Sequence, residues 1–88
     1  MEKSEALNRL IDLLNRFTLT EQIELLANVF IRLGLSRIKD SGIEIPKAIT
    51  AENLVPITAQ YKKQYGETLE GAMLFQGITI LMWLQNRR

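Results

Sequence analysis

Hydrophobic residues follow a helical spacing in the first part of the chain. Leu7, Leu10, Ile11, Leu14 and Phe17 stand at i, i+3, i+4, i+7 and i+10, which places them on one face of a helix. The residues between them are mostly polar, and Ser4 precedes them as an N-cap candidate. The pattern therefore predicts an amphipathic helix over about residues 4–17.

A second apolar run follows after a break of only a few residues. Thr18 and Glu21 have the spacing of a capping box, although Thr20 is an alternative cap. The run extends to Leu33 and is wider than a single stripe, and Gly34 is typical of a helix C-terminus. Because the connection is short, we expect the first two helices to form an antiparallel hairpin.

The middle of the chain has no regular period. Residues 39–42 carry a turn signal and residues 43–46 alternate before a proline, so we expect an irregular crossing over 35–49. Proline is tolerated without cost only in the first turn of a helix, where its missing N–H breaks no intrahelical hydrogen bond. We therefore expect a turn over 51–55 and a short third helix from Pro56 to Tyr65, ended by Gly66.

The last predicted helix runs from about Thr68 to Gln85 and is apolar on nearly every side between Ala72 and Leu84. A helix of this kind is usually buried. Gly77 costs stability inside a helix, which suggests close backbone packing there. Thirteen residues of helix span only about 20 Å, short of the roughly 30 Å of a bilayer core, so we expect no membrane span.

Together these elements predict one all-α domain over residues 1–88. It consists of a helical hairpin, an irregular crossing segment, a short third helix and a long buried C-terminal helix. A chain of 88 residues without Cys gains only marginal stability from its own core. We expect dimerisation to complete the fold.

The last helix is also the strongest indication of function. Its faces are covered by the other three helices, by another chain or by a membrane or lipid, and a symmetric dimer covers them more easily than the other three helices do. We therefore expect a non-catalytic protein–protein interaction or assembly module, acting as a homodimer or docked on a partner protein. The candidate interface residues are Phe75, Ile78, Met82, Trp83 and Val29.

The alternative is a small nucleic-acid-binding or regulatory protein. The net charge is only +1, but residues 32–63 carry six basic and three acidic side chains. In other proteins, lysines neutralise phosphates and the aromatic residues beside them stack on bases. The candidate basic surface consists of Arg37, Lys39, Lys62 and Lys63.

Catalysis has little support in the sequence. The chain has no His and no Cys, and its serines stand in no nucleophile motif. Three Glu-x-x-Glu pairs begin at Glu2, Glu21 and Glu67, and such helical pairs are similar to those of the all-α nucleotide pyrophosphohydrolases. That family adds a Glu-x-x-Asp on the next helix, which is missing here, and each pair lies near a predicted helix start, where negative charge is favoured. We expect no cofactor, metal or small-molecule substrate, and a cytoplasmic location.

Overall fold

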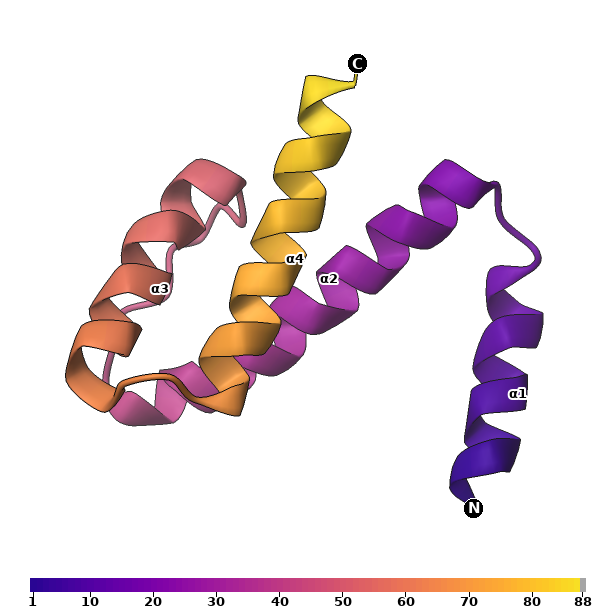
Figure 1. The fold of residues 1–88 in the computed structure, drawn as a ribbon, viewed down its shortest axis with the longest axis horizontal. Helices are drawn as coiled ribbons and strands as arrows, with labels where there is room; N and C mark the ends of the chain where they lie inside the picture. Colours follow the sequence, from indigo (N-terminus) through magenta and orange to yellow (C-terminus); the bar gives the residue numbers. More distant parts are fainter. Residues whose placement is uncertain (88) are drawn as a thin grey trace.

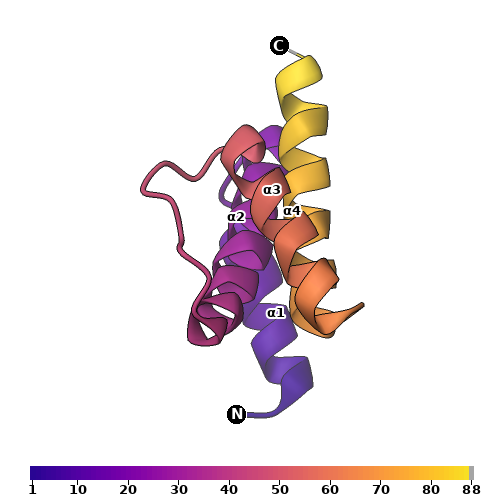
Figure 2. The same ribbon diagram turned by 90° about the vertical axis from the view of Figure 1, so that its left-hand side faces the viewer.

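The computed structural model describes residues 1–87, and all the regular secondary structure in that range is helical, which confirms the predicted fold class (Figure 1). The α-helices are α1 (Lys3–Leu14), α2 (Leu19–Ile38), α3 (Ala51–Tyr65) and α4 (Leu69–Asn86), and a single 3₁₀ turn, η1 (Lys39–Ser41), follows α2. The molecule measures 38 × 37 × 22 Å, so it is flat. Figure 2 shows the connection between η1 and α3 bulging from one side.

The most extensive packing joins α2 to α4, which cross in antiparallel directions. Two glycines allow the close approach. A Cβ atom on Gly34 would lie 3.1 Å from the backbone nitrogen of Leu74, and one on Gly77 would lie 2.5 Å from Cγ1 of Ile31. The expected close packing at Gly77 is therefore confirmed.

Gly34 does not end α2, contrary to the sequence prediction. The helix continues to Ile38, and both Leu35 and Ile38 are buried. The stabilisation from burying these side chains against α3 and α4 exceeds the cost of about 1 kcal/mol for glycine within a helix. Gly42, in the left-handed conformation at φ 87°, follows η1 and ends the helical segment.

The third helix also starts earlier than expected, at Ala51 rather than Pro56. Thr50 is its N-cap, and the Thr50 hydroxyl accepts a hydrogen bond from the Asn53 N–H at 3.2 Å. Ala51 and Leu54 are buried and hold the first turn in place. Pro56 lies inside the helix but is exposed, so only one intrahelical hydrogen bond is lost, on the solvent side.

A single core lies between α2, α3 and α4. It includes Ile31, Leu35, Ile38, Leu54, Ile57, Tyr61, Leu74 and Ile78, with Ile43 from the connection. None of its members comes from α1, which has no buried residue.

The first helix stands apart from the other three in Figure 1. Residues 15–18 join it to α2 by a short and well-bonded connection: Gln22 donates a side-chain hydrogen bond to the Phe17 carbonyl at 3.0 Å, and Thr18 caps α2. The connection is as short as predicted, but the predicted hairpin is wrong, because α1 and α2 diverge from it instead of packing against each other. The apolar face of α1 therefore does not reach the core.

Among the described residues, no helix has both the length and the apolar character needed to cross a bilayer.

Candidate functional site

Three exposed apolar helix faces form the most unusual surface of this molecule. The first, here called the α1 stripe, consists of Leu7, Leu10, Ile11 and Leu14. Leu7 and Ile11 are 56% and 45% exposed, whereas Leu14, beside the connection to α2, is half-buried. Phe17 continues the stripe into the connection and is also exposed. An aliphatic stripe of this kind is normally covered by another element.

The second face, the α2 stripe, lies on α2 outside its buried face. It consists of Leu26, Val29, Phe30 and Leu33, which have the same i, i+3, i+4, i+7 spacing as the α1 stripe. Leu26 is half-buried, and Val29 and Leu33 are about half exposed. α2 is therefore apolar on two sides, of which the core uses one.

The third face, the α4 stripe, consists of Phe75, Met82 and Trp83, all exposed. The guanidinium of Arg87 lies 4.2 Å from the ring centroid of Trp83, a cation–π contact that orients the indole. Only one side of α4 is buried, through Leu74, Gly77, Ile78 and Leu84. The expectation that α4 is covered on all sides is therefore met only where α4 packs on α2 and α3.

The structure places four of the five candidate interface residues on these exposed stripes: Val29, Phe75, Met82 and Trp83. Ile78 is the exception, because the structure buries it. It is only 3% exposed because it stands one helical turn after Leu74, on the side of α4 that packs into the core.

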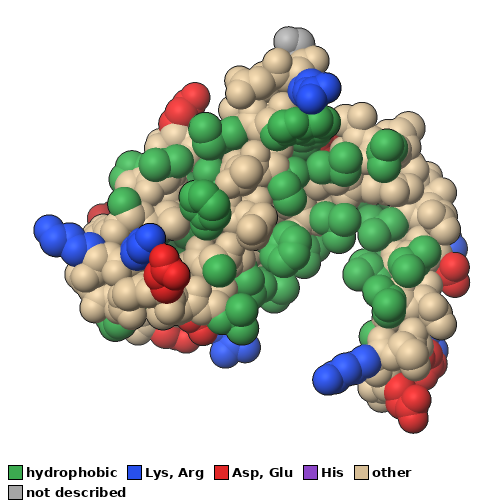
Figure 3. All heavy atoms as spheres, viewed as in Figure 1, with side chains coloured by type: hydrophobic (Ala, Val, Ile, Leu, Met, Phe, Trp, Pro, Cys, Tyr) green, Lys and Arg blue, Asp and Glu red, His purple; other side chains and the backbone are tan. Residues whose placement is uncertain are grey.

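A notch separates α1 from the rest of the molecule. Figure 3 shows hydrophobic side chains along both sides of this notch, with charged side chains mostly toward the ends of the elements. Large apolar patches on a soluble chain are typical of interaction surfaces.

The total accessible surface supports this interpretation. The chain exposes 6773 Å², whereas a compact monomer of its 10.1 kDa mass exposes about 5,300 Å². The chain therefore exposes about 1,500 Å² more than its mass predicts.

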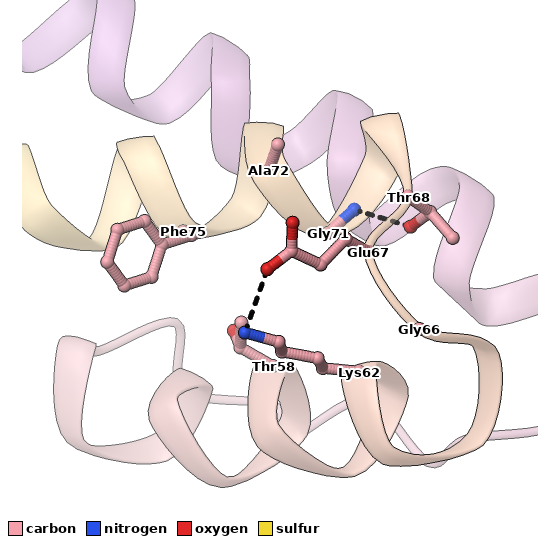
Figure 4. A pocket seen from close by; sticks show the side chains of 8 residues that line it. All are labelled: Thr58, Lys62, Gly66, Glu67, Thr68, Gly71, Ala72 and Phe75. Carbon is pink, nitrogen blue, oxygen red and sulfur yellow. Dashed lines mark hydrogen bonds and ion pairs between the residues drawn. The ribbon is translucent and has the colours of Figure 1, made fainter.

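A cavity of about 260 Å³ lies between the end of α3 and the start of α4, and Phe75 of the α4 stripe is one of the residues that line it (Figure 4). Lys62 reaches from α3 toward Glu67, and their Nζ and Oε1 atoms are 3.1 Å apart. The Thr68 hydroxyl accepts a hydrogen bond from the Gly71 N–H and is used as the N-cap of α4. The cavity thus presents mostly apolar walls and one solvent-exposed ion pair.

The candidate basic residues belong to two separate helix ends. Arg37 lies in the last turn of α2 and Lys39 in η1, while Lys62 and Lys63 lie in the last turn of α3. Cations are favoured at helix C-termini, which accounts for these positions. Tyr61 is buried, with its ring centroid 4.8 Å from that of Tyr65, so its ring is part of the core.

The carboxylates of Glu5, Glu21 and Glu67, from the three Glu-x-x-Glu pairs, make contacts within the chain itself. Glu21 completes the capping box: its carboxylate accepts a hydrogen bond from the Thr18 N–H at 3.0 Å, and its own N–H donates to the Thr18 hydroxyl. Two hydrogen bonds with Thr18 lower the pKa of Glu21 below its ordinary value. The bond with the Thr18 backbone has the larger effect, and the bond with the Thr18 side chain the smaller. Within residues 1–87, no three acidic side chains gather where they would hold a metal ion.

Sequence reasoning missed the α1 stripe as a candidate site because it placed these residues inside a hairpin. The sequence does contain the apolar stripe, because its residues follow a regular helical spacing. Its exposure depends on the path of the chain through residues 15–18, which periodicity does not encode.

Comparison with protein-family models, curated proteins and solved structures finds no match to this chain.

Proposed function

We propose that this chain is a non-catalytic protein-interaction module that binds another polypeptide through its exposed apolar stripes. The observation that carries this function is α1, a helix with a regular apolar stripe and no buried residue. Short helices owe most of their stability to packing of the apolar face. The α1 stripe, the α2 stripe and the α4 stripe therefore supply binding area that the chain's own core leaves unused.

Several features support a binding role over catalysis. The hydroxyls of Thr18, Thr50 and Thr68 all accept N-cap hydrogen bonds, and the Ser41 hydroxyl donates to the Ile38 carbonyl at 2.6 Å. With no His or Cys in the sequence, the usual general bases and thiol nucleophiles are missing.

No observation favours nucleic-acid binding over protein binding. Lys62 is paired with Glu67, and Tyr61, the aromatic residue next to it, is buried. The remaining candidate basic residues, Arg37, Lys39 and Lys63, are divided between two helix ends, whereas the apolar stripes extend along three helices.

Site-specific photo-cross-linking in the cells that express the protein tests this function. The photo-reactive residue benzoylphenylalanine replaces Leu33 on the α2 stripe in one variant. In the control variant it replaces Gln60 on the exposed polar side of α3. We expect a discrete cross-linked polypeptide from position 33 and none from position 60. Because the experiment uses whole cells, it does not depend on the cytoplasmic location expected from the sequence.

Val29→Lys, introduced beside the photo-reactive residue at position 33, is expected to abolish the cross-link. A product that forms equally from both positions, or no product from position 33, would show that the stripe binds no polypeptide.

A further inference from the structure

The three stripes leave open which polypeptide covers them, and the chain itself supplies both sides of a matching contact. The residues of the α1 stripe and of the α2 stripe stand at the same i, i+3, i+4, i+7 positions, and each stripe extends over about 10 Å. A face of this length and spacing packs against an equal face on a second helix. Within one chain the two stripes do not close on one another, because α1 diverges from α2 beyond residues 15–18 (Figure 1).

We infer that the partner is a second copy of this chain, in a two-fold symmetric dimer in which the α1 stripe of each protomer packs against the α2 stripe of the other. This inference rests on the proposed function and names its partner. In a two-fold dimer each chain gives α1 and receives the partner's α1, so both stripes are covered in both chains.

The exposed area agrees with such a dimer. Each chain exposes about 1,500 Å² beyond the expectation for a compact monomer, so two chains have about 3,000 Å² to bury. Permanent dimers bury about 2,000–5,000 Å² in total. The excess is about twice the standard docking area of about 1,600 Å².

The charges on the two helices do not oppose self-association. α1 carries Lys3 and Arg9 against Glu5 and Asp12, and Arg9 is already paired with Glu5 at 2.8 Å. α2 carries two acidic and two basic residues, Glu21, Glu24, Arg32 and Arg37. Neither stripe contains a charge, and the whole chain carries only +1, so two copies meet without net repulsion.

Two measurements test this dimer. The first is solution mass by light scattering over a wide concentration range, for the unaltered chain and for Leu10→Lys. We expect twice the 10.1 kDa chain mass for the unaltered protein. We expect Leu10→Lys to weaken the dimer about 100-fold, since a symmetric dimer contains the change twice.

The control variant is Val55→Lys, at an exposed apolar residue on α3 outside the three stripes. It is expected to keep the mass of the unaltered protein, and circular dichroism of each variant shows whether the helices remain. A helical chain that stays monomeric at every concentration would overturn the inference.

The second measurement distinguishes a dimer in which each α1 stripe packs on the partner's α2 stripe from dimers with other contacts. The chain has no Cys, so a Leu10→Cys chain mixed with a Val29→Cys chain is joined by a short thiol–thiol cross-linker only between molecules. We expect the mixed product from this pair and none from Leu10→Cys with Gln60→Cys. A dimer whose only product joins two Leu10→Cys chains would overturn the α1-to-α2 contact.

Failure of this inference is distinguishable from failure of the proposed function. A monomeric chain that still yields a cross-linked polypeptide of another kind from position 33 contradicts the self-association and retains the interaction module. A monomeric chain with no cross-link from position 33 contradicts both.

Discussion

The core of α2, α3 and α4 and the projecting α1 use the same kind of residue in different ways. α1 has the cleaner separation of apolar and polar sides, yet none of its residues is buried. α4 has almost no polar side, yet one of its faces packs closely on α2 through Gly77 and Leu74. An apolar stripe shows that a helix needs a cover, but it does not show which element or chain provides that cover.

Removing a core side chain should break the three-helix unit and gives the largest expected effect. Ile31 is fully buried, so Ile31→Ala is expected to lower the free energy of unfolding by about 3 kcal/mol. For a domain of this size that corresponds to a fall in Tm of about 12–24 °C. Thermal unfolding followed by circular dichroism measures it.

Leu10→Ala is the matched change on α1 and sharpens the comparison. Its effect on Tm is expected to be smaller and to decrease as the protein is diluted, because Leu10 stabilises only through a bound partner. Equal, concentration-independent losses from both variants would mean that α1 belongs to the core.

Adding one methyl group at the crossing of α2 and α4 should have an intermediate effect. In Gly77→Ala the new Cβ atom meets Ile31 and the Ala27 carbonyl, so we expect a net loss of about 1–2 kcal/mol despite the better helix propensity of alanine. Urea unfolding measures this loss. Thr79→Ala, at an exposed position of the same helix, is the control and should change stability by no more than about 0.5 kcal/mol.

The smallest expected effect lies at the connection between the two regions. Thr18→Ala removes the N-cap of α2 and is expected to cost about 1 kcal/mol. Glu21 adds a pH dependence: because its folded pKa is lowered below 4.5, its stabilisation is present above that pH and is lost as the pH falls through the folded pKa.

Glu21→Gln should therefore flatten the Tm-against-pH curve below about pH 4.5. The unaltered chain is measured in the same pH series. A curve that keeps its slope in Glu21→Gln would remove the capping box as the cause.

Sequence reasoning recovered the four helices and three of their starts, because caps and apolar periods are local. Thr18 caps α2 as predicted, and α4 begins directly after Thr68, close to the predicted start. Ser4 is not the N-cap of α1, because the helix begins at Lys3 and its N-cap is Glu2, which makes no side-chain capping bond. Sequence reasoning also erred at Gly34 and Pro56, where burial of Leu35 and Leu54 outweighed two residues that usually interrupt helices. Those outcomes depend on contacts between distant segments, which no local pattern contains.

The candidate site was predictable in part for the same reason. α2 and α4 carry more apolar residues than one buried face accommodates, and the structure exposes four of them: Val29, Phe75, Met82 and Trp83. Ile78 could not be told apart from them, since α4 is apolar on nearly all sides. The exposure of Leu7 and Ile11 follows from the direction in which α1 leaves residues 15–18.

The isolation of α1 has a further consequence if a partner covers this helix, as we propose. A helix with no buried residue opens at small cost, so proteases are expected to reach its backbone while α2, α3 and α4 stay folded. A bound partner would remove that access. We therefore expect unassembled chains to be degraded first, so that the number of intact molecules follows the number that have bound a partner.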